Sequence, residues 1–311
     1  MHTPAHFIHP STSQGARRPL ALRPAQRGMT LIELLVGIAI GLMVVAVAGV
    51  ALMTSRGVSG TVSDTSNINQ QAAYAMRVIG LQLRQAGSLR LNLNPGEANA
   101  VNAAAAPVAF EKSADADGGN DFNLANIAQI ISEDADNVLT VGYQRYADPL
   151  FVGSGSLARN CIGGPDNSNT DQRVESLFSF IAPDAGTGEK GHLRCGGNDA
   201  VPQPLIESVA NFQLRYLVQA ASGSSLGNPT VEYVNAAAVT NWGQVQAVEV
   251  CLVLYGSEAI DLPAGSSYLD CDGSTSVDMT TLTDTQRKNR MHRVFRNVFQ
   301  LRAQGLLGSV L

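Results

Sequence analysis

An unbroken apolar run near the N-terminus is the strongest pattern in this sequence. Residues 34–53 read LLVGIAIGLMVVAVAGVALM, and no charged side chain occurs between Leu34 and Ser55. A helix of about 20 apolar residues spans the roughly 30 Å hydrocarbon core of a bilayer. A very hydrophobic buried helix is the alternative, but a protein core seldom needs so long an uninterrupted run. The run therefore predicts a transmembrane helix.

Beyond Arg56 the apolar positions continue on one face of a helix only. They recur at helical spacing at Ile68, Ala72, Ala75, Met76, Ile79 and Leu83. This spacing is typical of an amphipathic helix that packs on a globular domain. Because Gly87 is a suitable C-cap, we expect one helix from about residue 29 to residue 86, loosened at Gly57 and Gly60.

The C-terminal half shows the shorter periods of β-strands. Five apolar or alternating runs are bounded by turn residues: 138–143, 173–182, 208–219, 244–256 and 292–302. Residues 245–254 are apolar at most positions on both faces, which predicts a central strand. We expect all five runs to form one antiparallel sheet, so the fold class is α+β.

The segment between helix and strands, residues 88–137, is rich in Ala, Asn, Asp and Gly and is predicted to be a variable connecting region. Within it, Asp115, Asp117 and Asp121 with Gly118 and Gly119 faintly resemble a calcium loop. The ligand spacing and closing glutamate of an EF-hand are missing, so a solvated loop is favoured. We predict no metal site and no cofactor.

Charge separates the two ends of the chain. The formal net charge is −5, and the only charged residues before Gly28 are Arg17, Arg18, Arg23 and Arg27, so the remainder carries −9. That balance argues against nucleic-acid binding. By the positive-inside bias, residues 1–28 stay cytoplasmic and everything after Arg56 is exported.

The four cysteines fall in the exported part, and none belongs to a CxxC pair. Two disulfides in an oxidising compartment fit this pattern. Pairing Cys161 with Cys195 and Cys251 with Cys271 closes local loops. The two other connectivities that four cysteines allow stay open.

Residues for catalysis are scarce. His2, His6 and His9 precede Gly28, which leaves only His192 and His292, and no GxSxG, HExxH, GxGxxG or P-loop pattern occurs in the exported part. We predict that the chain is not an enzyme. A membrane-tethered hydrolase that uses scattered Asp and Ser residues is the weaker alternative.

The junction between the basic stretch and the apolar run carries the most specific motif. In Gly28-MTLIE the acid Glu33 is the fifth residue after the glycine. A carboxylate in an apolar helix costs about 2.5–3.5 kcal/mol, so it is expected to have a partner or to lie at the headgroup level. The basic leader, Gly28, Glu33 and the apolar helix together resemble the class III signal of type IV prepilins.

This resemblance implies that a prepilin peptidase cuts between Gly28 and Met29 and N-methylates the new terminus. The family usually has phenylalanine where this chain has Met29. The resemblance also implies that Glu33 attracts the amino terminus of a neighbouring subunit during assembly. The physics agrees, because opposite charges leave water at tolerable cost only when they meet.

Within the family, the layout is most similar to minor pilins of the PilW type. The resemblance implies a long N-terminal helix on an antiparallel sheet domain, divided into a cleaved leader (1–28), a transmembrane half (29–55), an amphipathic half (56–87), the connecting region (88–137) and the sheet domain (138–311).

The implied function is structural: a minor pilin in type IV pilus assembly or priming, held in the bacterial inner membrane and then at the cell surface. Implied partners are the prepilin peptidase and other major and minor pilins, with a tip adhesin as a further candidate. The alternatives are a pseudopilin of a type II secretion system and a single-pass anchored binding module.

Overall fold

The computed structural model describes residues 28–88, 91–92, 109–110, 131–133, 138–146, 148–150, 153–168, 173–219, 231–240 and 242–301. The chain divides into two compact units, Met1–Ser55 and Arg56–Leu311. Each is described by itself. Residues 1–27 of the predicted leader and the Asp115–Asp121 segment lie outside the described residues.

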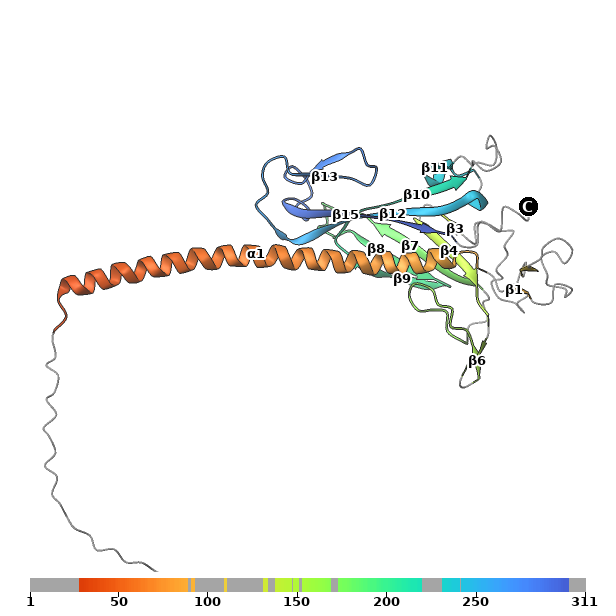
Figure 1. Ribbon diagram of the computed structural model, residues 1–311, viewed down its shortest axis with the longest axis horizontal. Helices are drawn as coiled ribbons and strands as arrows, with labels where there is room; N and C mark the ends of the chain where they lie inside the picture. The colour runs from red at the N-terminus through yellow and green to blue at the C-terminus, as the bar shows by residue number, and fades with distance from the viewer. Residues whose placement is uncertain are drawn as a thin grey trace, which may run out of the picture. The chain divides into compact units, whose positions relative to one another are not determined.

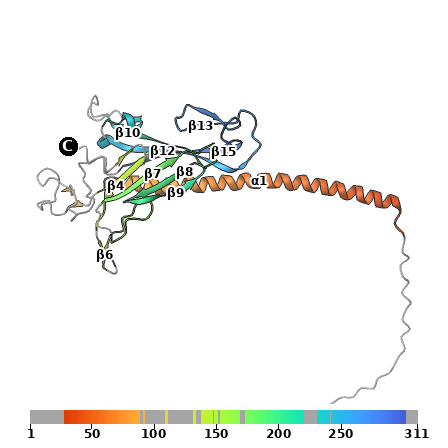
Figure 2. The same cartoon turned by 180° about the vertical axis from the view of Figure 1, so that it is seen from behind.

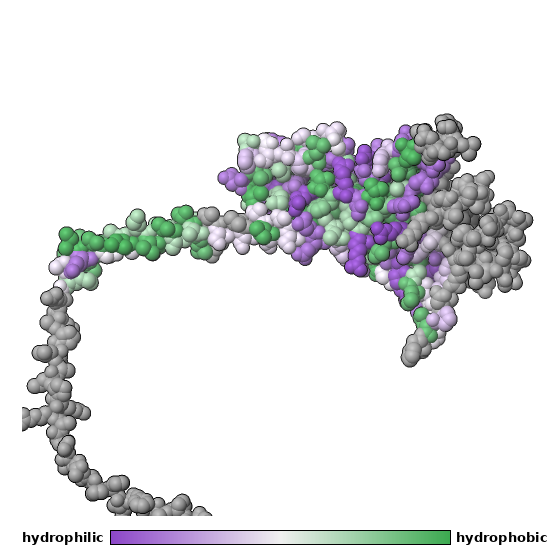
Figure 3. All heavy atoms as spheres, in the orientation of Figure 1, coloured by the Kyte–Doolittle hydropathy of each residue, from purple (hydrophilic) through white to green (hydrophobic). Residues whose placement is uncertain are grey.

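The first unit holds the start of helix α1, which spans Leu31–Gln85. Its segment Leu31–Met53 is long and apolar enough to cross a membrane, with a mean hydropathy of 2.7 and no residue buried within the chain. Figure 3 shows apolar side chains along this segment. Such exposure in water would be costly, whereas a lipid or helical surrounding removes the cost.

In the second unit, the rest of α1 packs on the sheets. The apolar residues Ile68, Ala72, Ala75, Ile79 and Leu83 are all at most 2% exposed and share one core with both large sheets. The predicted amphipathic face is thus confirmed. The helix stops before Gly87, whose φ of 66° suits glycine, and the Gly87 N–H donates to the Gly142 carbonyl.

The strands form two large antiparallel sheets beside α1 (Figures 1 and 2). The five-stranded sheet has the order β3 (Ile131–Ser132), β4 (Leu139–Gln144), β7 (Arg173–Ile181), β8 (His192–Gly197) and β9 (Ala200–Glu207). The four-stranded sheet has the order β11 (Val231–Val234), β10 (Val209–Gln219), β12 (Val245–Ala259) and β15 (Arg290–Gln300).

The prediction of a single sheet was therefore wrong. The two sheets separate at Ser208, which links β9 to β10 in a left-handed conformation with a φ of 58°. A non-glycine residue adopts this region only when its surroundings hold it. Here the Ser208 carbonyl accepts the Tyr255 N–H, and the next residue, Val209, donates its N–H to the Gly191 carbonyl.

The prediction of a central strand is confirmed. β12 lies between β10 and β15, with Leu252 opposite Phe212 on one side and Phe295 on the other. Its two faces enter different cores. From residue 248 on, even-numbered residues such as Val250 join the core with α1, and Cys251, Val253 and Tyr255 join a second, smaller core.

The remaining elements are short. They are the strand pairs β1 (Leu91–Asn92) with β2 (Ala109–Phe110), β5 (Asp148–Pro149) with β6 (Ser154–Gly155) and β13 (Ser267–Leu269) with β14 (Ser276–Asp278), and the 3-10 helices η2 (Ala236–Ala238) and η3 (Trp242–Gln244). β13 and β14 lie in the long connection between β12 and β15, where the sequence pattern predicted no strands.

Candidate functional site

Gly28 and Met29 precede the first turn of α1 and are exposed. A Cβ added at Gly28 would have no atom within 4 Å outside its chain neighbours, so nothing in the described fold requires glycine there. A glycine that its own chain does not need is compatible with selection by an outside molecule that reads this backbone. The structure thus leaves the predicted processing position accessible.

Glu33 lies in the first turn of α1 and is held by Thr30. Its Oε2 accepts the Thr30 N–H at 2.9 Å and the Thr30 hydroxyl at 3.0 Å, while the Glu33 N–H donates back to Thr30 Oγ1 at 3.3 Å. This is a capping box, in which a threonine N-cap and a glutamate three residues later satisfy each other's backbone donors. The carboxylate also lies at the positive end of the helix dipole.

The capping box gives Glu33 a role within its own chain that the sequence reasoning missed. The signal was available, since T-x-x-E before an apolar run predicts a helix start. Among the described residues Glu33 makes no ion pair, so its charge has donors but no opposite charge. The attraction to a neighbour's amine stays a prediction.

Polar contacts in the second unit lock α1 to the sheets at separate points along the helix. Asp64, 6% exposed, accepts the Ser257 hydroxyl at 2.6 Å and the Glu258 N–H at 2.8 Å just past the buried part of β12. A Cβ added at the neighbouring Gly256 would lie 2.5 Å from an Asp64 carboxylate oxygen, so this close approach requires glycine.

At the other end of the helix, Gln82 makes the equivalent contact with the five-stranded sheet. It is 7% exposed, accepts the Ser176 hydroxyl at 2.9 Å and donates to the Arg159 carbonyl at 3.3 Å. Ser176 Oγ in turn accepts the Cys161 N–H at 3.1 Å. A buried amide is tolerated when its oxygen and its NH2 group both have hydrogen-bond partners. Such contacts fix the position of the helix along the sheet.

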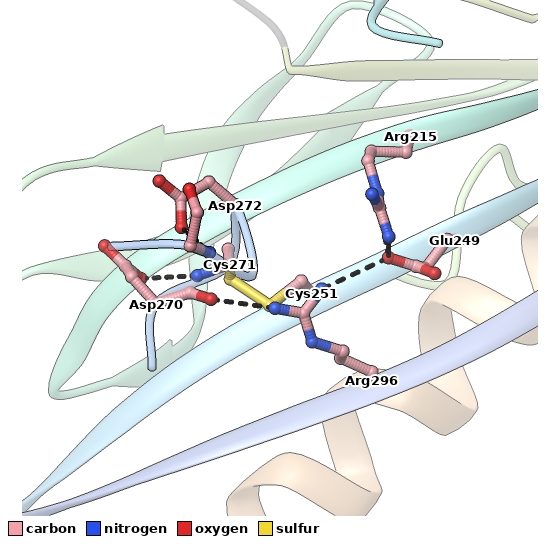
Figure 4. A network of polar contacts seen from close by, with 8 residues as sticks. Arg215, Glu249, Cys251, Asp270, Cys271, Asp272 and Arg296 are labelled. Carbon is pink, nitrogen blue, oxygen red and sulfur yellow. Dashed lines mark hydrogen bonds and ion pairs between the residues drawn. A yellow bond between two sulfur atoms is a disulfide. The ribbon is translucent and has the colours of Figure 1, made fainter. Parts of the chain in front are cut away.

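The cysteines form the pairs Cys161–Cys195 and Cys251–Cys271, with Cα atoms 6.2 and 5.6 Å apart. These are the pairs that local loop closure favours. The second disulfide joins a polar network on the outer face of the four-stranded sheet, where Glu249 accepts from Arg215 at 2.7 Å and from Arg296 at 3.3 Å (Figure 4).

The described residues contain no cluster of three or more His, Cys, Asp or Glu side chains that could hold a metal ion. The arrangement is one of anchoring and interlocking contacts: an apolar helix with a capped acidic start, and a cross-linked domain fastened to its second half. Such an arrangement suits a structural subunit.

Two family models match this chain. Residues 23–49 match the prokaryotic N-terminal methylation motif, which includes Gly28, Met29 and Glu33. Residues 181–303 match Type IV Pilus-assembly protein W, from the end of β7 through β15. In these two segments the chain is similar to type IV prepilins and to pilus-assembly proteins of the PilW type.

The methylation motif lies on the capped start of α1, and the PilW match lies on the sheet domain of the second unit. A comparison with curated proteins gave no matching sequence. Among solved structures, a type IV-like pilin from Thermus thermophilus matches with a TM-score of 0.33 and 9% sequence identity, covering 75% of this chain and 95% of that protein.

Proposed function

We propose that this chain is a PilW-like prepilin that is cut after Gly28 by a prepilin peptidase, N-methylated at Met29 and built into a type IV pilus as a minor pilin. The observation that carries the proposal is the capped acidic start of a membrane-length apolar helix directly after Gly28. The match of residues 181–303 to the PilW model favours a pilus over a type II secretion pseudopilus.

The four arginines before Gly28 favour a leader that stays in the cytoplasm, with the domain after Arg56 exported from the bacterial inner membrane. After assembly the subunit lies at the cell surface. Its partners are other pilins and the pilus machinery, and a tip adhesin is a further candidate partner. Its role is structural, in priming or extending the fibre, and involves no catalysis.

Mass spectrometry of the mature protein tests the processing step. We expect an N-methylated Met29 at the terminus, and replacement of Gly28 with leucine should block cutting. An intact leader in wild-type cells, or a terminus beyond residue 53, would refute the proposal.

Variants of Glu33 and Thr30 separate capping from charge. Glu33→Val loses both the capping box and the charge. Glu33→Gln keeps an oxygen that can accept from Thr30 but loses the charge, and Thr30→Ala loses most of the capping box but keeps the charge. None of the three substitutions introduces a new charge into the apolar helix. Membrane insertion and cutting after Gly28 should therefore continue.

We expect incorporation into sheared fibres to fall for Glu33→Val and Glu33→Gln while membrane abundance stays level. Thr30→Ala should remain near wild type, since the attraction between the carboxylate and a neighbour's amine survives. Incorporation of Glu33→Gln at the wild-type level would show that capping, and no intersubunit attraction, is the function of this residue.

A further inference from the structure

The connection between β12 and β15, residues 260–289, lies on the second core of the four-stranded sheet and is called here the 260–289 excursion. It contains the β13–β14 hairpin, and its two ends meet where the Ile260 N–H donates to the Asn289 carbonyl at 2.7 Å. The residues it packs against, Val253 and Val294, belong to this second core, which is separate from the core that contains α1.

The excursion contributes few side chains to that core. Among the described residues, the second core has five buried members, of which the excursion supplies only Cys271, with Tyr268 partly buried beside it. Hydrogen bonds add to the attachment. Arg296 donates to the Asp270 carbonyl at 2.8 Å (Figure 4), and Asn211 donates to the Asp270 carboxylate at 2.9 Å. Each remaining contact therefore matters for keeping the excursion closed.

Tyr268 stacks on His292 of β15, and its hydroxyl accepts a hydrogen bond from Arg287 within the excursion at 3.1 Å. The two ring centroids are 4.9 Å apart with planes at 9°, and Tyr255 of β12 stacks on the same imidazole at 5.8 Å and 29°. His292 is 7% exposed. Its Nδ1 lies 3.0 Å from the Arg290 carbonyl, so Nδ1 carries the proton, and the buried Nε2 has no hydrogen-bond partner among the described residues.

This environment disfavours a charged imidazole. Protonation would place a second N–H at Nε2, buried without an acceptor. Burial is the main cause that lowers the pKa of His292 to about 4, and the nearby Arg287 lowers it further, while the Arg290 carbonyl, Asp270 and Asp284 oppose the change. Attraction of a cationic ring to the tyrosine faces acts in the opposite direction.

We propose that the 260–289 excursion is an acid-released cover, in which protonation of His292 breaks the Tyr268–His292–Tyr255 stack and frees the excursion from the sheet. The Cys251–Cys271 disulfide keeps the opened excursion tethered, so that it closes again when the imidazole loses its proton. Opening uncovers the apolar side chains of Val253 and Val294 while the core with α1 stays intact.

The size of the effect follows from the two protonation equilibria. When the excursion is open, the His292 imidazole has an ordinary pKa of about 6.5, and in the closed stack its pKa is about 4. Opening is then favoured by a factor of about 20 at pH 5 relative to pH 7, and of about 100 at pH 4. Closure is therefore most favoured at neutral pH and weakens as the pH falls from about 6.5 to 4.

Hydrogen exchange of the full-length chain in detergent tests the proposal, with rates corrected for intrinsic exchange. Between pH 7 and pH 5, amides of the 260–289 excursion should lose protection by about 20-fold, while those of β4 and β7 keep theirs. Fluorescence of the single tryptophan, Trp242, which packs edge-on to Tyr216 in the main core, should not change.

The decisive variant is His292→Phe, which can still stack but cannot titrate; His292→Gln serves if the phenylalanine variant does not fold. Either should abolish the pH dependence of exchange in the excursion. His192→Phe is the matched control. His192 Nδ1 also lies 3.0 Å from the carbonyl of the residue two positions earlier, Lys190. Among the described residues, however, no aromatic ring stacks on His192. The control variant should behave as wild type.

Three results would overturn the proposal. The first is equal protection of the excursion at pH 7 and pH 5 in the wild type. The second is a folded His292 variant that retains the wild-type pH dependence of exchange. The third is a change of the Trp242 fluorescence together with exchange in the excursion, which would mean that acid unfolds the whole domain.

Discussion

Replacement of Gly80 with alanine probes how closely α1 approaches β15. Gly80 lies within the helix, and a Cβ built there would be 2.8 Å from Phe299 Cδ1 and closer still to Cε1. Phe299 is itself only 4% exposed and belongs to the main core. The ring therefore has little room to move away, and the helix or the strand must shift.

Two opposing effects determine whether Gly80→Ala raises or lowers the free energy of unfolding. Alanine is favoured over glycine in a helix interior by about 1 kcal/mol. Overpacking a well-packed core costs about 1–3 kcal/mol, and a contact this short against an aromatic ring lies in the upper part of that range. We therefore expect Gly80→Ala to lower the free energy of unfolding by about 1–2 kcal/mol, and Tm by roughly 2–8 °C.

Thermal unfolding of the full-length chain in detergent, followed by Trp242 fluorescence, provides the assay. Gly60→Ala is the matched control, because the nearest atom outside its helix is Glu258 Cγ at 3.6 Å, an ordinary contact. It should raise stability by up to about 1 kcal/mol. Combining Gly80→Ala with Phe299→Leu should recover part of the loss, as expected for a direct contact. A Gly80→Ala protein as stable as wild type would refute the close-approach argument.

Three further variants test the remaining contacts. Asp64→Asn weakens two hydrogen bonds to a buried carboxylate and should cost about 1.5–3 kcal/mol in chemical denaturation; an unchanged midpoint would contradict the anchoring role. Gln82→Leu should cost about 1–3 kcal/mol, with partial recovery when Ser176→Ala is added, whereas strictly additive losses would argue against their coupling. Replacing Cys251 and Cys271 with alanine should lower stability by about 2–4 kcal/mol and raise proteolysis within 260–289 at neutral pH, and unaltered cleavage there would show that the disulfide is not needed for closure.

The helix and most of the strands could be predicted because their signals are local. Helical spacing identified Ile79 and Leu83 as core residues, and the run 173–182 gave β7 to within one residue. Alternation reports which faces are buried, but it does not report which strands pair. The division into two sheets depends on the backbone of Ser208 and its partners across the chain, which no local pattern encodes.

There is also a physical reason why the sequence pattern did not predict β8 and β9. β9 contains Pro202 and Pro204, which cannot donate to a ladder and which usually argue against a strand. They are tolerated because β9 is the edge strand of its sheet in the described part of the chain, next to β8. β8 in turn is rich in glycine and ends at the β8–β9 turn, where Asn198 and Asp199 both have positive φ.

The residues of the candidate site also differ in whether a local sequence pattern could predict them. Gly28 and Glu33 were singled out because the basic leader, their spacing and the apolar helix together resemble the prepilin signal. Thr30 could have been predicted as well, since the capping box is a four-residue pattern. Asp64 and Gln82 could not, because a helical pattern assigns polar residues to the exposed face. Their burial depends on partners at least 77 residues away in the chain.

The polar anchors at Asp64 and Gln82 are separated by about 27 Å of helix, with the tight Gly80–Phe299 crossing close to the second. A pull along the helix axis would load the anchors and the apolar interface between them at the same time, in shear. A pull across the axis would instead break the anchors and the apolar contacts one after another. The second unit is thus suited to resist tension along its helix, which is the load that the proposed function in a fibre would place on it.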